Sequence, residues 1–323
     1  MFFSEPVRVG VVGVGYLGSL HVKRLGEIDY ARLVGIYDIN ESRAREISSK
    51  YGIEAYPSLR SLIEDVEAVI VAAPTTAHYS IAKECITAGR HVFVEKPLTD
   101  SLETAREIVE LSKKHGVKVQ VGHVERFNPA FLSALPYIEG RVYFVESVRM
   151  SVYNPRGTDV DVILDLMIHD IDLTLALMGE EPTSVSAVGI PVVTGDIDIA
   201  NVRLEFPSGA VANLTASRVS LEKMRKFRVF VMNRYLSIDL YRRRIDMVQK
   251  VGGELMPYFP PVDATKDAIT LELEAFLEAV RGEKEVPVSA EDGYRSMKVA
   301  DMIKRGIYDR IRRVRENEDP GTR

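Results

Sequence analysis

A lysine at the end of an apolar run is the first residue in this 323-residue chain that could take part in catalysis. Lys96 follows the run His91–Val94 and stands within Glu95-Lys96-Pro97. An ammonium at the carboxyl edge of a strand could steady a developing alkoxide or adjust a neighbouring base. The structural alternative is a pairing of Lys96 with Glu95 or another surface acid. Pro97 makes that alternative less attractive because it is a candidate for a cis peptide bond.

Asp165 and His169 form a second cluster with catalytic potential. If this segment is helical, the two residues share a face, and Asp172 lies one turn further. A carboxylate beside an imidazole orients it and raises its basicity, which suits a general base at neutral pH. A buried structural pair is an equal alternative. A divalent-metal site is poorly supported, because no second histidine stands nearby at ligand spacing.

A glycine-rich turn would place a cofactor near these groups. An apolar run leads into Gly13, Gly15 and Gly18, spaced as G-x-G-x-x-G, and a helical pattern follows. Gly13 permits the tight turn, Gly15 lets the backbone approach a pyrophosphate, and Gly18 allows close packing of helix on strand. The N–H groups at the start of the helix, around Tyr16 and Leu17, would face the anion.

Asp38 completes the dinucleotide-binding pattern. It ends the apolar run Leu33–Tyr37 and stands 20 residues after Gly18, the spacing expected of a carboxylate that binds the adenosine ribose. Because a carboxylate repels a ribose 2′-phosphate, NAD is favoured over NADP. Arg43 and Arg45 follow closely and could accommodate NADP, although exposed helical arginines are the simpler interpretation.

Two domains are expected from the order of elements. Apolar runs alternate with helix-length segments in residues 1–122, which predicts an α/β Rossmann domain with a doubly wound parallel sheet. Strand-like runs dominate residues 141–249 and predict a mostly antiparallel sheet. We expect residues 123–309 to form a substrate-binding and oligomerisation domain of the α+β class, and residues 310–323 a charged, solvated tail.

Composition narrows the class of protein. The chain is 46% hydrophobic and 28% charged, and its net charge of −5 argues against nucleic-acid binding. Cys85 is the single cysteine, which fits a reducing compartment. The N-terminus lacks the pattern of a signal peptide, and no apolar run approaches the ~20 residues that span a membrane. A cytoplasmic protein without membrane contact is expected.

The remaining histidines give weaker signals. His78 follows Pro74 and Thr75 after the third predicted strand and could line the cofactor cleft. His123 opens the interdomain segment and could contact substrate or only the hinge. Ordinary helix or strand-edge positions are expected for His21, His91 and His115.

Together these motifs resemble the Gfo/Idh/MocA family, the glucose–fructose oxidoreductase and inositol dehydrogenase family. The similarity is collinear over nearly the whole chain and rests on the glycine turn with Asp38, Pro74-Thr75-x-x-His78, Glu95-Lys96-Pro97, Asp165-x-x-x-His169 and the late segment 287–293. It implies an N-terminal Rossmann domain and a C-terminal domain built on a large open sheet. It also implies dimers or tetramers, which such sheets commonly mediate.

The resemblance assigns a catalytic trio. His169 would be the general base, Asp165 would orient it or a substrate hydroxyl, and Lys96 would bind and polarise the reacting hydroxyl. Asp170 receives no role. The expected cofactor-binding residues are Gly13, Gly15, Tyr16, Leu17, Gly18, Asp38, Pro74, Thr75, His78, Glu95 and Lys96. The expected substrate-binding residues are Lys96, Arg126, Asn128, Tyr153, Asp165 and His169.

Within the family, segments 121–129 and 159–170 resemble enzymes that oxidise the 3-hydroxyl of UDP-N-acetylglucosamine to a ketone. An aminotransferase can convert that ketone to a 3-amino sugar for lipid A or other envelope glycans. A diphosphate needs cationic partners, and Arg126, Arg149 and Arg156 are candidates, with salt bridges as the alternative for each. Two other functions remain open: a dehydrogenase of a free sugar or cyclitol, and a dinucleotide-binding sensor without turnover.

Overall fold

The chain folds into two compact units. The structure, a computed structural model, describes residues 5–154 and 160–318. Of these, residues 5–127 and 266–294 form the first unit, and residues 128–154, 160–265 and 295–318 form the second. The sequence predicts a division near residue 122, and the first division in the structure falls at residue 127. Segment 266–294, expected in the second domain, is grouped with the first.

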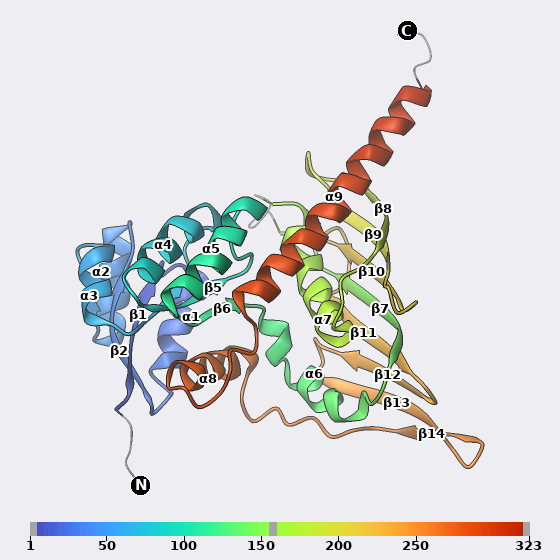
Figure 1. The fold of residues 1–323 in the computed structure, drawn as a ribbon, viewed down its shortest axis with the longest axis horizontal. Coiled ribbons are helices and arrows are strands. Elements are labelled where there is room, and N and C mark those ends of the chain that lie inside the picture. Colours follow the sequence, from blue (N-terminus) through green and yellow to red (C-terminus); the bar gives the residue numbers. More distant parts are fainter. Residues whose placement is uncertain (1–4, 155–159, 319–323) are drawn as a thin grey trace. The chain divides into compact units, whose positions relative to one another are not determined.

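A parallel sheet of six strands forms the centre of the first unit, in the order β3-β2-β1-β4-β5-β6 (Figure 1). Its strands are β1 (Val7–Val12), β2 (Ala31–Tyr37), β3 (Glu54–Ala55), β4 (Ala68–Val71), β5 (His91–Glu95) and β6 (Val119–Gly122). The apolar runs become parallel strands because helices shield both of their faces from water. The strand order reverses beside β1, and ligands of such sheets bind at the carboxyl ends there.

The helices of this unit are α1 (Tyr16–Leu25), α2 (Glu41–Tyr51), α3 (Leu59–Asp65), α4 (Thr75–Thr87), α5 (Leu102–His115), the 3₁₀ helix η1 (Val124–Phe127) and α8 (Ala268–Val280). Polar caps begin several of them: Asn40, for example, accepts a hydrogen bond from the N–H of Arg43 at the start of α2. α8 packs into the core of β1 and β5, where Phe276 meets Phe93 edge to face at 5.9 Å. This contact explains why a late segment belongs to the first unit.

An eight-stranded sheet forms the second unit, in the order β14-β13-β12-β11-β7-β10-β9-β8. It consists of β7 (Val142–Met150), β8 (Ser184–Ile190), β9 (Ile199–Glu205), β10 (Val211–Ser217), β11 (Met224–Val231), β12 (Arg234–Asp239), β13 (Arg244–Val251) and β14 (Glu254–Tyr258). β7 and β10 pair in parallel, and the other neighbours are antiparallel. The predicted mostly antiparallel sheet is therefore confirmed.

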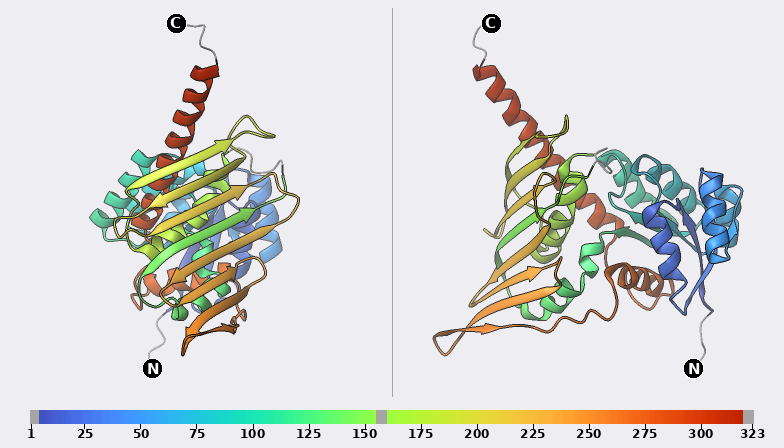
Figure 2. Two further views of the ribbon diagram at one scale, coloured as in Figure 1. Left: turned by 90° about the vertical axis from the view of Figure 1, so that its right-hand side faces the viewer. Right: turned by 180° about the vertical axis from the view of Figure 1, so that it is seen from behind.

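Helices lie on one face of this sheet, as the face-on view shows (Figure 2). They are α6 (Pro129–Ala134), the 3₁₀ helix η2 (Leu135–Tyr137), a π-helical turn η3 (Ile163–Met167), α7 (Ile168–Met178) and α9 (Ala290–Glu318), which belongs to this unit from residue 295 onward. Residues 310–318, expected as a solvated tail, continue α9. Ile311 packs against the core of the second unit, and this contact supports the helix within the expected tail.

Candidate active site

The glycine turn joins β1 to α1 with the geometry that a dinucleotide site requires. Gly13 has a φ of +82°, and a Cβ there would lie 2.6 Å from the backbone nitrogen of Ala73. A Cβ on Gly18 would lie 1.8 Å from the carbonyl oxygen of Gly13. A Cβ on Gly15 would meet nothing within 4 Å. The turn is therefore tight against its own unit and open at Gly15, which fits a pyrophosphate approaching the backbone.

Asp38 lies directly after β2 and is tied to the glycine turn. Its Oδ2 accepts a hydrogen bond from the N–H of Val14, and its Oδ1 accepts one from the N–H of Asn40, both at 2.8 Å. Asp38 also lines a cavity of about 330 Å³ together with Ile39 and Arg45. A carboxylate thus borders the cavity at the end of β2, where the adenosine ribose is expected.

The two arginines that could accommodate NADP differ in their contacts. Arg43 donates from Nε to the carbonyl of Val14 at 2.8 Å and from Nη1 to Glu46 at 2.7 Å. Arg45 contacts Glu41 at 3.5 Å and borders the same cavity as Asp38. Arg45 is therefore the better-placed candidate for a 2′-phosphate.

The other predicted cofactor residues of this region lie at the starts of helices. Tyr16 and Leu17 open α1 with 79% and 42% of their surface exposed. Pro74 caps α4, and Thr75 is its first residue. His78 is buried, with its Nδ1 2.9 Å from the carbonyl oxygen of Pro97 and its Nε2 2.8 Å from that of Ala73. Its ring therefore lies inside the unit and joins the turns that follow β4 and β5.

Lys96 follows β5 at the carboxyl edge of the sheet, and its peptide bond to Pro97 is cis, as expected. Glu95 Oε2 accepts a hydrogen bond from the backbone N–H of Lys96 at 3.3 Å. Glu95 Oε1 lies 2.7 Å from Nε2 of His21, a buried residue of α1. The carboxylate of Glu95 thus anchors the turn that carries Lys96.

His21 and Glu272 are buried polar residues to which the sequence analysis gave no functional role. His21 shares the buried face of α1 with Val22 and Leu25, and Glu272 shares that of α8 with Leu273. A polar side chain within an apolar helical stripe is the signal that could have found them.

Asp165 and His169 belong to the second unit, at the junction of η3 and α7. The turn begins where Asp161 Oδ1 accepts hydrogen bonds from the N–H groups of Ile163 and Leu164, both at 3.0 Å. A π turn holds more residues than an α turn, so residues four apart remain on one face. Both side chains are half-buried. Asp165 therefore lies on a π turn, of the kind that is frequent at functional sites, and His169 lies in the first turn of α7, so both residues are helical as expected.

The structure places Arg149, a predicted diphosphate ligand, in a buried ion pair instead. It forms a bidentate ion pair with Asp170, at 2.8 Å from Nε to Oδ2 and 3.0 Å from Nη2 to Oδ1. Both side chains are 2% exposed. The salt-bridge interpretation therefore holds for Arg149, and Asp170, which had no predicted role, fixes α7 to β7.

The other predicted substrate residues have varied surroundings. Arg126 on η1 lies 3.9 Å from Asp292 through Nη2, with 16% of its side chain exposed. Asn128 caps α6: its Oδ1 accepts from the N–H of Ala130, and its Nδ2 donates to the carbonyl of Leu240. Tyr153 is exposed after β7. Arg156 lies outside the described residues.

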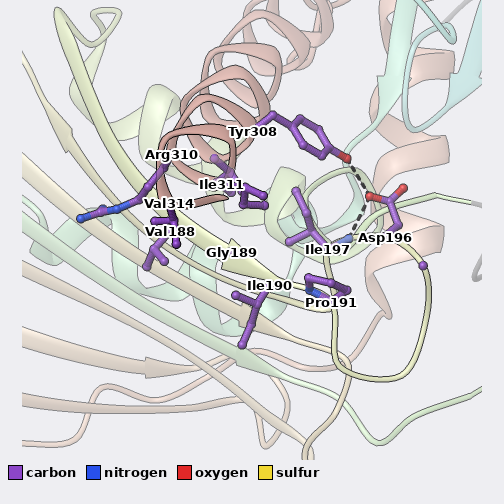
Figure 3. Close-up of a pocket in the computed structure, with 12 residues that line it drawn as sticks. Val188, Gly189, Ile190, Pro191, Asp196, Ile197, Tyr308, Arg310, Ile311 and Val314 are labelled. Atoms are coloured by element: carbon purple, nitrogen blue, oxygen red, sulfur yellow. Dashed lines mark hydrogen bonds between the residues drawn. The ribbon is translucent and has the colours of Figure 1, made fainter. Parts of the chain in front are cut away.

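A separate cavity of about 460 Å³ lies in the second unit, between β8 and the last turns of α9 (Figure 3). Apolar side chains including Val188, Ile311 and Val314 line it, and Tyr308 donates a hydrogen bond to Asp196 at 2.8 Å beside them. Its lining includes none of the predicted site residues.

Within residues 5–154 and 160–318, no helix has both the length and the apolar character that a membrane crossing needs.

Comparisons with known proteins agree with this geometry. The family model described as "Oxidoreductase family, NAD-binding Rossmann fold" matches residues 7–123, and the "GFO/IDH/MocA C-terminal domain" model matches residues 140–236.

UDP-N-acetylglucosamine 3-dehydrogenase of Acidithiobacillus ferrooxidans is 35% identical over 91% of this chain and 95% of its own. Its solved structure matches with a TM-score of 0.89, covering 94% of this chain and 98% of that one. Myo-inositol 2-dehydrogenase of Thermotoga maritima is 31% identical over 94% of this chain and 97% of its own. The chain therefore belongs to the Gfo/Idh/MocA family of oxidoreductases.

Proposed function

We propose that this protein is an NAD-dependent dehydrogenase that oxidises the 3-hydroxyl of UDP-N-acetylglucosamine to a ketone. The observation that carries this proposal is the 35% identity to UDP-N-acetylglucosamine 3-dehydrogenase along almost the whole of both chains. The product ketone is a suitable substrate for an aminotransferase, which would lead to a 3-amino sugar for lipid A or another envelope glycan.

NAD is the proposed cofactor because of the residues at the end of β2. The open position at Gly15 and the helix start at Tyr16 suit a pyrophosphate. The carboxylate of Asp38 borders the adjoining cavity and would repel a ribose 2′-phosphate. Bound NAD would supply the hydride acceptor, taking two electrons and one hydrogen from the carbinol carbon.

The chain's own groups would manage the proton and the developing charge. His169 takes the hydroxyl proton as the carbon–oxygen bond becomes a carbonyl. Asp165, on the same helical face, orients the imidazole or a substrate hydroxyl. The ammonium of Lys96 donates a hydrogen bond to the reacting oxygen and stabilises the negative charge that develops on it.

A panel of substrates tests the proposal. NADH formation would be followed with UDP-N-acetylglucosamine, other nucleotide sugars, free sugars and cyclitols, with mass spectrometry of the product. Turnover that depends on the UDP group supports the proposal. The 31% identity to a myo-inositol dehydrogenase favours a cyclitol as the second candidate, and turnover of free polyols alone would establish that candidate. A protein that binds NAD but turns over no member of the panel would instead fit the sensor.

Replacing the general base gives a sharper test. His169→Ala should lower kcat by about 10²- to 10⁴-fold, the usual contribution of a positioned base, with NAD affinity nearly unchanged. Lys96→Ala should also lose most turnover. Single-turnover hydride transfer at several pH values measures the chemical step. His115→Ala, on α5, is the matched control and should behave as wild type. Full activity in His169→Ala would return the Asp165–His169 pair to a structural role.

A further inference from the structure

Three ionisable side chains meet inside the first unit. They are His21 on α1, Glu95 at the end of β5 and Glu272 on α8, and their ligand atoms all lie within 4.8 Å of one another. His21 and Glu272 are each 1% exposed. The shortest contact joins His21 Nε2 to Glu95 Oε1 at 2.7 Å. Two carboxylates this close, one buried and the other 12% exposed, cannot both be ionised without a cost.

The surrounding charges determine which of the two carboxyl groups, Glu95 or Glu272, is protonated. Burial would raise the pKa of Glu95, but the hydrogen bond and charge of His21 and the charge of Lys96 together lower it below its usual value. Burial raises the pKa of Glu272 well above its usual value, and the charges of Glu95 and Asp267 raise it further. Asp267 is itself paired with Arg24 of α1 at 2.5 Å. Glu95 is therefore the ionised member and Glu272 the protonated one near neutral pH.

The hydrogen bonds around Glu272 support this assignment. Gln120 on β6 donates from Nε2 to the backbone carbonyl of Glu272 at 2.9 Å. Gln120 Oε1 and Glu272 Oε2 are both buried acceptors without a hydrogen-bond partner in the part of the chain that the structure describes. A proton on Glu272 converts one of these acceptors into a donor and lowers the cost of burying them.

Glu95 connects this cluster to the proposed catalytic lysine. Its Oε2 accepts the backbone N–H of Lys96 at 3.3 Å, while its Oε1 contacts His21. On the neighbouring strand, a Cβ on Gly122 would lie 2.9 Å from the same Oε2. The carboxylate is thus held between α1, the end of β6 and the peptide of Lys96.

We propose that His21 is a positioning residue: it holds the Glu95 carboxylate against the peptide of Lys96, in a network whose third member is Glu272. The proposal rests on the proposed function, since it assumes that Lys96 acts on the substrate. It links α1, which begins at the glycine turn, to the lysine that follows β5. The same three side chains could in principle hold a divalent cation. The direct His21–Glu95 contact at 2.7 Å favours the network, because a shared ion would separate these two groups.

Kinetics of four variants test the positioning role. His21→Leu removes the N–H group that donates to Glu95. It should lower kcat about 10- to 100-fold, which corresponds to the loss of one charge-assisted hydrogen bond. The affinity for NAD should stay within a few fold of wild type. His21→Gln keeps an N–H donor and should recover most of the loss. Glu95→Gln and the His21→Leu/Glu95→Gln double variant should resemble His21→Leu, because the two residues act as one unit. Val22→Ala, on the same buried face of α1, controls for lost stability and should keep the wild-type kcat.

A second measurement does not depend on turnover. Trace acetylation of the holoenzyme with acetic anhydride, read by mass spectrometry across pH, reports the reactivity of Lys96, with exposed Lys114 as the internal reference. In His21→Leu, the Glu95 carboxylate is no longer held against the Lys96 peptide, so the labelling profile of Lys96 should change while that of Lys114 stays constant. An unchanged Lys96 profile, or a His21→Leu kcat equal to wild type, would overturn the positioning role.

The two proposals fail in different ways. An active wild type whose His21→Leu variant is equally active, with unchanged Lys96 labelling, leaves the dehydrogenase in place and removes the network. A wild type without turnover, but with the expected change in Lys96 labelling, removes the dehydrogenase and leaves the network in place. One equivalent of a divalent metal in purified protein, lost in Glu272→Gln, would overturn the network in favour of a metal site.

Discussion

Asp38 has two roles, a structural one in the glycine turn and an electrostatic one at the cofactor, and they must be separated before its effect on cofactor choice can be measured. Its Oδ2 holds the N–H of Val14 within the glycine turn, so Asp38→Ala would loosen the turn as well as remove the charge. Asp38→Asn keeps an oxygen acceptor for that N–H. We expect Asp38→Ala to weaken NAD about 10- to 100-fold, and Asp38→Asn to lose less NAD affinity while gaining NADP affinity.

Fluorescence titration with both cofactors measures this change. The matched control is the double variant Asp38→Asn/Arg45→Ala. Arg45 borders the same cavity and should be the group that attracts the 2′-phosphate. Identical affinities of wild type and Asp38→Asn for both cofactors would remove Asp38 from the ribose site.

Arg126 is the predicted diphosphate ligand that the structure leaves partly exposed, in contrast to the buried Arg149. Arg126→Ala should raise KM for the UDP-sugar about 10- to 100-fold with little effect on NAD binding. Arg126→Lys should recover only part, since an ammonium lacks the planar fork. Steady-state kinetics with UDP as competitive inhibitor measures the effect.

Asp292→Asn is the control for Arg126, because it breaks the 3.9 Å contact without removing the guanidinium. Failure of UDP to inhibit wild type at millimolar concentration would contradict the nucleotide-sugar substrate.

Single residues also mark the limit of prediction from sequence. The glycines and Asp38 could be assigned because their spacing alone encodes a turn and a strand end. His21 and Glu95 are 74 positions apart, and Arg149 and Asp170 are 21 apart, so their pairing depends on how helices pack on strands. Local patterns carry no information about such contacts, and both pairs were therefore missed.

Among the elements, the apolar runs Leu33–Tyr37 and His91–Val94 could be recognised in the sequence, and they lie within β2 and β5. Helix α9 continues into the segment expected as a tail, because Ile311 follows Ile307 at helical spacing and packs against the core of the second unit. β14 was not predicted because all five of its residues are exposed and show no alternation of buried and exposed positions.

Asp198 organises the loop between β8 and β9 that borders the cavity of Figure 3. Its Oδ2 accepts N–H bonds from Val192, Val193 and Thr194, at 2.7–2.8 Å. Burial alone would raise the pKa of Asp198, but hydrogen bonds from the side chain and backbone of Thr194 and from its neighbours lower it to about 2. A lowered pKa contributes stability above the unfolded value near 3.8, and this stability is lost as the pH falls towards 2.

Asp198→Asn should therefore be less stable than wild type by about 2 kcal/mol above pH 4, and the difference should shrink as the pH approaches 2. Urea unfolding of both proteins from pH 2 to 7 measures it. Glu222→Gln, at an exposed position, is the control and should show little difference from wild type across this range. A difference that stays constant with pH would show that packing, not charge, accounts for the effect of Asp198.

At the scale of the whole molecule, the eight-stranded sheet has one face without helices in Figure 2. Phe144, Phe230 and Tyr235 lie side by side on neighbouring strands, with ring centroids 5.2 Å apart for Phe144–Phe230 and 4.8 Å for Phe230–Tyr235. Their sequence neighbours Val145 and Val229 are fully buried in the core. Because side chains alternate along a strand, the three rings occupy the helix-free face.

Apolar clusters of this kind on a sheet face favour association, and we expect a homodimer or homotetramer built through this face. Phe230→Asp should place a charge in the contact and lower the mass in solution, to one chain for a dimer or to two chains for a tetramer with a second interface, because an unpaired charge is costly where water is excluded. Its circular dichroism should stay that of wild type, since the ring lies outside the core of its own unit. Leu132→Asp, an exposed apolar position on α6 on the opposite side of the sheet, should leave the mass unchanged. Light scattering after size-exclusion chromatography decides the matter: a wild type that is already monomeric at micromolar concentration, or a Phe230→Asp protein of unchanged mass, would place the interface elsewhere or remove it.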